Sequence, residues 1–253
     1  MELRPLGPYV ERVTTAGELA STSLSGLSTE FEPFLPLFVD QVLRRGGEVL
    51  TRRRAGRTEA LLLRVAEEHG GSLFGSDLAS IVALAAERSP SSYFVEQRAA
   101  TVVDELDVWA VELGPDRPAP PLRHLVRTAA ASDRDAIARL TAAVGGPTEP
   151  RWIRPLEESG ATCWVAEWDR RIVGLGWAEY VAGRGRVHSG MVDPRYRRLG
   201  IGADLLEARL RWLTARGAHR AISEISTSNL GSRRAAERSG MRPVAPMYLA
   251  RFA

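Results

Sequence analysis

The alternation of hydrophobic and polar positions is clearest in the second half of the chain. Apolar runs with the length and composition of strands occur at 122–129, 163–168, 172–180, 186–192, 219–226 and 244–252. Apolar positions at helical spacing occur at 132–144, 203–217 and 232–240. The predicted order is strand, helix, three strands, helix, strand, helix and strand. This order predicts an α/β fold in which helices flank a mixed sheet.

The first half of the chain shows a weaker pattern of the same kind. Helices are predicted at 34–47 and 77–88, and strands at 48–53, 59–67, 71–76, 92–97 and 107–113. The order of helix, three strands, helix and strand also occurs in the middle of the second half. We therefore expect the N-terminal part to be a degenerate copy of the C-terminal fold.

A proline-rich segment separates the two patterns. Residues 115–121, PDRPAPP, contain four prolines in seven positions. Proline neither donates to a β-ladder nor continues a helix, so this segment is expected to be a stiff connector. The predicted domains are therefore residues 1–114 and 122–253, with 115–121 as the linker.

Length and composition are those of an ordinary globular protein. The chain has 253 residues, of which 44% are hydrophobic, and a formal net charge of +3. No run of about 18 apolar residues occurs, so no membrane span is predicted, and the first residues lack the apolar core of a signal peptide. The mild charge predicts no nucleic-acid partner. Because Cys163 is the single cysteine, no intrachain disulfide can form, and the expected location is the cytoplasm.

Two further features of the composition exclude classes of chemistry. All 34 basic residues are arginines, so neither a P-loop lysine nor a lysine Schiff base is available. The four histidines, His69, His124, His188 and His219, show no metal-ligand spacing, and no metal is expected.

A glycine-rich turn stands between a predicted strand and the helix at 203–217. Residues 192–206 read VDPRYRRLGIGADLL. The start of a helix presents backbone N–H groups that the helix cannot satisfy, and its dipole favours an anion. Gly200 and Gly202 have no Cβ, so a bulky anion can approach the main chain, and nearby arginines supply forked donors. The stretch predicts a pyrophosphate site.

The same stretch resembles the acyl-CoA-binding motif of the GCN5-related N-acetyltransferase (GNAT) superfamily. Residues 197–202 read Arg-x-x-Gly-x-Gly and follow Val-Asp-Pro-x-Tyr at 192–196. Asn229 stands eleven residues before a Gly-Met pair at 240–241, where members of the family commonly have asparagine and Gly-Phe. The resemblance covers residues 122–253 in element order. It implies a GNAT fold in this half and acetyl-CoA as the acyl donor.

The resemblance also implies where CoA would bind. Its pantetheine arm would lie between two parted parallel strands, 186–192 and 219–226, and its pyrophosphate would meet the amides of the glycine turn. The implied contact residues are Met191, Val192, Arg197, Arg198, Leu199, Gly200, Ile201, Gly202, Ala203 and Asn229. The corresponding N-terminal stretch, GSLFGSD at 71–77, lacks arginine, so one CoA per chain is expected.

Acyl transfer to an amine needs a base and a polarised thioester carbonyl. A backbone N–H at Val192 can polarise the carbonyl. His188 stands four residues earlier, and in a strand without a bulge the two side chains share a face. Histidine is a suitable base near neutral pH, and this spacing resembles the arylalkylamine branch of the family. Glu179 and Glu224 are the other candidate bases, and simple packing is the alternative role for His188.

The general acid is the point at which the chain departs from the family. Many members carry a tyrosine seven residues after the asparagine, where this chain has Ala236. Tyr248 or Ser226 could protonate the leaving thiolate, or the thiolate could leave without a proton.

The sequence thus predicts an acyl-CoA-dependent N-acyltransferase that acts on a small-molecule or peptide amine. The alternative is a CoA-binding regulatory or scaffold protein, which the missing tyrosine suggests. A homodimer is compatible with either function.

Overall fold

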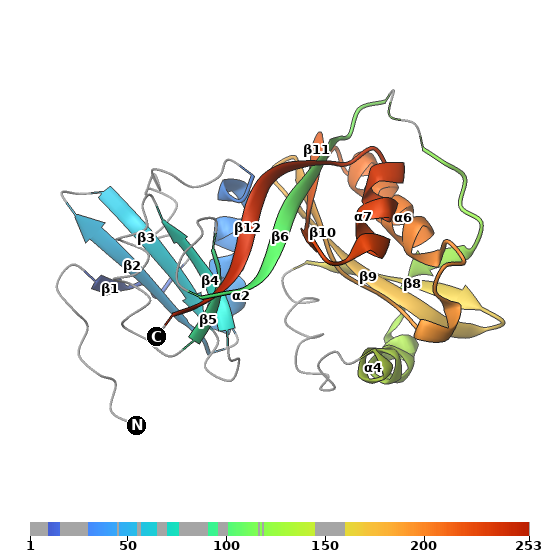
Figure 1. Cartoon of the computed structure of the whole chain (residues 1–253), viewed down its shortest axis with the longest axis horizontal. Helices are drawn as coiled ribbons and strands as arrows, with labels where there is room; N and C mark the ends of the chain where they lie inside the picture. The colour runs from blue at the N-terminus through green and yellow to red at the C-terminus, as the bar shows by residue number, and fades with distance from the viewer. Residues whose placement is uncertain are drawn as a thin grey trace. The chain divides into compact units, whose positions relative to one another are not determined.

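The computed structural model describes residues 10–15, 30–44, 46–54, 57–64, 70–75, 91–95, 101–115, 117, 119–144 and 160–252. The chain divides into two compact units (Figure 1). Unit 1 consists of Met1–Leu106 with Ala245–Ala253, and unit 2 of Asp107–Val244. No helix in the described ranges is long and apolar enough to cross a membrane.

Unit 1 contains one sheet and helix α2. Its described elements are β1 (Val10–Arg12), the 3-10 turn η1 (Glu32–Phe34), α2 (Leu35–Arg44), β2 (Glu48–Arg54), β3 (Arg57–Arg64), β4 (Gly70–Gly75), β5 (Ser91–Val95) and the start of β6 (Thr101–Glu112). The strand order is β1-β2-β3-β4-β5, followed by the end of β12 (Arg242–Phe252). Helix α2 packs on β2 and β3 through buried residues that include Leu35 and Val39. These elements confirm the predictions for this half, apart from β1, which was not predicted. The helix predicted at 77–88 lies outside the described residues.

Unit 2 contains the larger set of described elements. These are the end of β6 (Thr101–Glu112), β7 (Leu125–Thr128), α4 (Arg134–Ala143), β8 (Thr162–Trp168), β9 (Arg171–Val181), β10 (Arg184–Val192), α6 (Ile201–Ala215), β11 (Arg220–Ser226), α7 (Leu230–Arg238) and the start of β12. The strand order is β12-β6-β11-β10-β9-β8-β7. Strands β7 to β10 pair antiparallel, whereas β10 and β11 are parallel. The predicted order of elements and the mixed sheet are confirmed.

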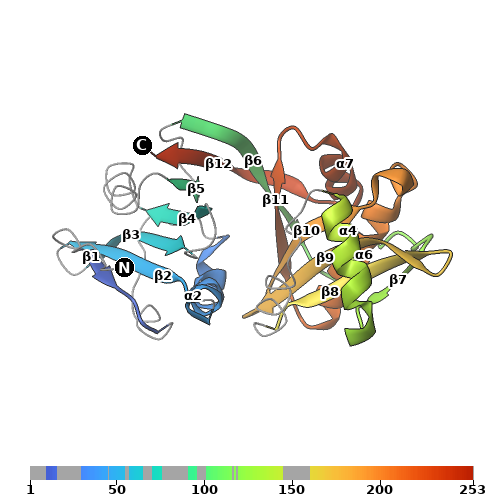
Figure 2. The same cartoon turned by 90° about the horizontal axis from the view of Figure 1, so that it is seen from below.

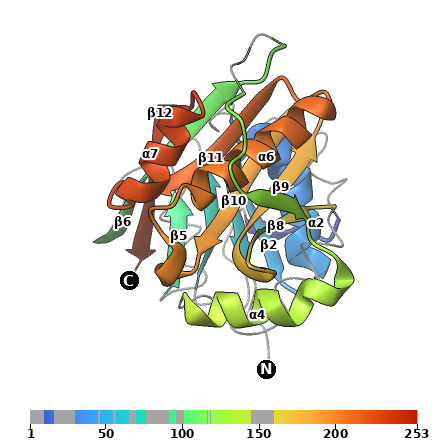
Figure 3. The ribbon, with the colours of Figure 1, turned by 90° about the vertical axis from the view of Figure 1, so that its right-hand side faces the viewer.

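The two faces of this sheet carry different helices (Figures 2 and 3). Alternate residues of β9 show the division. Trp177 packs with Leu140 of α4, whereas Ala178 packs with Leu210 of α6. Gly176 also faces α6, because a Cβ at this position would lie 2.7 Å from a guanidinium atom of Arg209. The amphipathic pattern of the sequence thus places α4 on one face of the sheet and α6 on the other.

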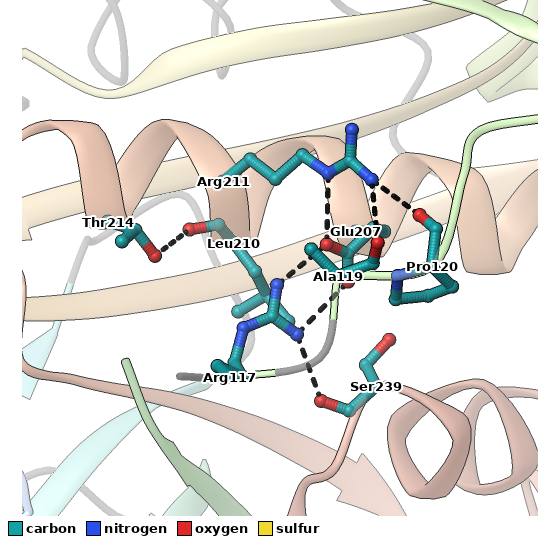
Figure 4. A network of polar contacts seen from close by, with 8 residues as sticks. All are labelled: Arg117, Ala119, Pro120, Glu207, Leu210, Arg211, Thr214 and Ser239. Carbon is teal, nitrogen blue, oxygen red and sulfur yellow. Dashed lines mark hydrogen bonds and ion pairs between the residues drawn. The ribbon is translucent and has the colours of Figure 1, made fainter. Parts of the chain in front are cut away.

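The described part of the proline-rich segment lies against α6 (Figure 4). The Arg117 guanidinium donates to both carboxylate oxygens of Glu207, at 2.6 and 3.1 Å. Arg211, one turn along the helix, donates to the same carboxylate at 3.1 Å. The Arg117 and Glu207 side chains are only 7% and 2% exposed, so this is a buried ion pair.

The contact with α6 continues past the prolines. The Asp204 carboxylate accepts hydrogen bonds from the backbone N–H groups of Arg123 and His124, at 2.9 and 3.0 Å. The segment at 115–121 therefore joins β6 to β7 within unit 2. The domain boundary predicted at this segment differs from the division between the compact units, which falls after Leu106 and returns the end of β12 to unit 1.

Replacing Glu207 with leucine should lower the free energy of unfolding by about 3–5 kcal/mol, because it leaves the buried Arg117 charge without its partner. Urea unfolding of the full chain measures the change. Glu112→Gln is the matched control. Glu112 pairs with Arg220, but its side chain is 67% exposed, and removing its charge should cost less than about 1 kcal/mol. Equal losses in the two variants would contradict the stabilising role of the buried pair.

Candidate functional site

Strands β10 and β11 are paired at one end only. Their parallel register runs from Arg184 opposite Arg220 to Arg186 opposite Ile222. Strand β10 continues to Val192 and β11 to Ser226, with no further pairing of the two among the described residues. The main-chain groups along these facing edges are therefore available to an extended polyamide, as in strand addition.

A β-bulge interrupts β10 within this unpaired part. His188 lies opposite Trp177, and Met191 lies opposite Leu175, so two residues of β10 face Gly176 alone. Ser189, inside the bulge, has a φ of +50°, in the left-handed region that non-glycine residues rarely adopt.

The bulge corrects the prediction that His188 and Val192 share a face. Val192 lies opposite Gly174 and packs with Leu205 of α6. His188 lies opposite Trp177, which packs on α4. The extra residue reverses the alternation, so the histidine faces the α4 side and the valine faces α6.

The glycine turn has the conformation that its sequence predicts. Arg198 and Gly200 have φ values of +64° and +95°, and α6 begins at the next residue, Ile201. The carbonyl of Gly200 accepts the N–H groups of Ala203 and Asp204, at 3.0 and 3.1 Å. The earlier N–H groups of the turn and first helical residues have no acceptor within the helix, as at any helix N-terminus.

Gly202 leaves open space at the helix start. A Cβ built on it would meet its nearest neighbour, the Val192 Cγ2, at an ordinary 3.7 Å. The main chain is thus accessible to a bulky group at this point. The residues present fit an anion such as a pyrophosphate, because backbone donors and the helix dipole converge here.

Charged side chains surround the turn. Arg197 and Arg198 are exposed, and Arg197 donates from Nε to the Val192 carbonyl at 3.1 Å. The carboxylate of Asp193 accepts the backbone N–H and guanidinium of Arg195. These hydrogen bonds, led by that of the Arg195 side chain, hold the pKa of Asp193 below its ordinary value. The negative charge beside the turn is therefore offset by a neighbouring cation.

The three candidate bases meet on the α4 face of the sheet. Nε2 of His188 lies 3.5 Å from Oε1 of Glu179, whose side chain is 1% exposed. Arg186 joins this pair to Glu224, because its guanidinium donates to Glu179 at 3.2 Å and to Glu224 at 2.9 Å. We call these four residues the polar cluster. Burial alone would lower the pKa of Arg186, but the two carboxylates outweigh it and raise that pKa above its ordinary value.

The two nitrogens of His188 have different surroundings. Nε2 faces the buried carboxylate of Glu179, whereas Nδ1 lies 3.0 Å from the hydroxyl of Ser189, an exposed residue. A carboxylate can accept the N–H of the imidazole nitrogen that faces it, which leaves the other ring nitrogen as the acceptor. The arrangement can therefore accept a proton at the other nitrogen.

The other predicted residues have different positions. Asn229 is the N-cap of α7, and its Oδ1 accepts the N–H of Ser232 at 3.1 Å. Ala236 is fully buried in the core between α6 and α7. Ser226 ends β11, with its hydroxyl 2.9 Å from that of Ser228. Tyr248 belongs to unit 1, where it lies opposite Val95 of β5.

Sequence reasoning missed two arginines at this site, Arg186 in the polar cluster and Arg209 beneath the bulge. Arg209 is 5% exposed and donates to the carbonyls of Trp177 and His188, both at 3.1 Å. A glycine within a predicted strand, Gly176, is the signal that could have indicated the close approach of another group.

The parted parallel strands, the bulge and the glycine turn all belong to one α/β domain. Residues 132–241 match the model of the acetyltransferase (GNAT) family. This part of the chain is therefore a GNAT domain and a member of the GNAT superfamily. No curated protein matches the sequence.

Solved structures show the same fold over nearly the whole chain. A GCN5-related N-acetyltransferase from Sphaerobacter thermophilus aligns with a TM-score of 0.65 and 18% identity, covering 98% of this chain and 96% of the other. A tandem GNAT protein from the clavulanic acid biosynthesis pathway aligns with a TM-score of 0.66 and 12% identity, covering 96% of this chain and 98% of the other. A GNAT-family acetyltransferase from Colwellia psychrerythraea aligns with a TM-score of 0.63 and 11% identity, covering 96% of this chain and 99% of the other. At these identities the likeness establishes the fold, which is that of a tandem GNAT protein.

Proposed function

We propose that this protein is an acyl-CoA-dependent N-acyltransferase, with acetyl-CoA as the donor and an amine as the acceptor. The observation that carries the proposal is the combination of parted β10 and β11 edges with the glycine turn at the start of α6. A long polyamide that ends in a pyrophosphate needs both features within reach of each other. The amides of residues 198–203 would hold the pyrophosphate, and the main chain at Met191 and Val192 would hold the arm.

The polar cluster supports a role as the base in direct attack. A neutral amine attacks the thioester carbonyl, and the proton that it loses passes to Nδ1 of His188, on the side of the exposed Ser189. Glu179 stabilises the imidazolium that results, because its carboxylate faces Nε2. Arg186 donates to the carboxylate of Glu179 and so fixes its position. A backbone N–H at Val192 would polarise the thioester carbonyl.

The second candidate is a CoA-binding regulatory or scaffold protein. Ala236 favours it, because the position of the family's tyrosine is filled by a small side chain that is fully buried. Such a protein would use the same cleft and bind CoA without turning it over.

A screen of amine acceptors with acetyl-CoA, read as release of free thiol, separates the two functions. The acyltransferase predicts amine-dependent thiol release and an acylated product that mass spectrometry detects. CoA binding without thiol release for any of the small amines, amino acids and peptides in the panel would favour the regulatory protein.

A further inference from the structure

Arg209 is a buried cation beneath the bulge of β10. It projects from α6, and its guanidinium donates to three backbone carbonyls, those of Leu205 at 2.9 Å and of Trp177 and His188 at 3.1 Å. Two of these carbonyls belong to Trp177 and His188, which lie opposite each other immediately before the bulge. The side chain therefore fixes the backbone just before the residues that would meet the thioester.

The charge of Arg209 is held by backbone carbonyls and not by a carboxylate of the described residues. Across the described ranges, no carboxylate lies within ion-pairing distance of its guanidinium. Burial lowers the pKa of Arg209 to about 10, and the group still carries its proton at neutral pH. A buried charge that no opposite charge offsets is costly, and ionisable groups perturbed by burial cluster at functional sites.

Glycines make the space that this guanidinium occupies. A Cβ at Gly176 would lie 2.7 Å from Cζ of Arg209, and one at Gly190 would lie 3.5 Å from Nη2. Gly190 is one of the two residues of the bulge that face Gly176. The positive charge thus lies directly against the main chain of the bulge.

The reaction proposed above creates a negative charge on sulfur, and Ala236 stands where many members of the family have the tyrosine that protonates it. We propose that Arg209 stabilises the CoA thiolate as it leaves, so that the thiolate departs without a general acid. This inference rests on the proposed function and adds a residue to it.

The atoms and charges of the step balance. The amine nitrogen forms a bond to the acyl carbon, and the carbon–sulfur bond breaks with its electron pair on sulfur. The amine proton goes to His188. Arg209 keeps all its protons and acts only through its positive charge. The released thiolate takes a proton from water, and His188 returns the amine proton to the solvent, where it neutralises the hydroxide that remains.

Titration of the CoA thiol bound to the full-length protein tests this role without turnover. The thiolate is followed by its ultraviolet absorbance against pH, with desulfo-CoA as the blank. In the parent protein the bound thiol should titrate about one pKa unit or more below the thiol of free CoA, as expected for a nearby charge in a partly buried site. Arg209→Met should remove this shift, and Arg209→Lys should restore part of it.

Arg211→Met is the matched control, because it removes the same charge from the same helix at a residue that is 41% exposed and paired with Glu207. The thiol of CoA bound to this variant should titrate like the thiol of CoA bound to the parent. A bound thiol that titrates like free CoA in the parent would overturn the inference even if Arg209→Met fails to fold. The same holds if Arg209→Met keeps the parental shift. If the parent binds no CoA at all, the proposed function itself fails, and the two failures are thus distinguishable.

Discussion

Replacing His188 with alanine should lower the turnover of acetyl-CoA with a productive amine by roughly two to four orders of magnitude, the usual contribution of a general base. The expectation rests on the position of the imidazole, between the buried carboxylate of Glu179 and the exposed hydroxyl of Ser189. CoA affinity should barely change, because the turn and helix start that would hold the pyrophosphate lie beyond the bulge.

His219→Ala is the control for this variant. His219 is exposed and precedes β11 at the end where β10 and β11 are paired, away from the parted edges. Its loss should leave turnover near the parental value. Near-parental turnover in His188→Ala would instead assign the histidine a packing role and leave Glu179, Glu224 or a water chain as the proton route.

Gly202→Glu should abolish CoA binding while leaving the fold intact. The added carboxylate would occupy the open space at the start of α6 and place a negative charge where a pyrophosphate would bind. The fold should tolerate the change, because a Cβ at this position meets no atom closer than 3.7 Å. An acidic residue in the first turn also interacts favourably with the helix dipole, by about 0.3–1 kcal/mol.

Calorimetric titration with CoA measures the loss of binding, and thermal unfolding measures whether the fold is kept. Gly114→Glu serves as the matched control, because a Cβ at Gly114 meets nothing within 4 Å and the residue lies outside the turn. It should bind CoA like the parent. Binding of CoA by Gly202→Glu with parental affinity would show that the turn is not the pyrophosphate site.

Local patterns in the sequence predict most of the fold. The helices and strands of unit 2 follow from the spacing of their apolar residues. The turn before α6 follows from Gly200, whose positive φ a residue with a side chain rarely adopts. Strand β1 was missed because its three residues, Val10–Arg12, are too few to show an alternation. The division between the compact units differs from the predicted boundary at 115–121, because β6 and β12 each contribute residues to both units. Proline content could not indicate that the segment at 115–121 packs on α6.

The candidate site was predictable only where it depends on neighbours in sequence. His188, Glu179 and Glu224 were identified one by one, but the contacts of Arg186 that join them span 7 and 38 positions in the chain. Arg209 reaches carbonyls that are 32 and 21 positions away. The bulge was missed as well, since one extra residue in a strand changes no local pattern but reverses every side chain after it.

Calorimetric titration of the full-length protein with acetyl-CoA tests the central claim, that the chain holds a single acyl-CoA site in unit 2. The account predicts saturable binding of one equivalent per chain, because the turn with arginines and glycines at 197–202 occurs once in the sequence. The N-terminal stretch at 71–77 lacks arginine and ends in an aspartate. Two equivalent sites per chain, or no binding at all, would contradict the account.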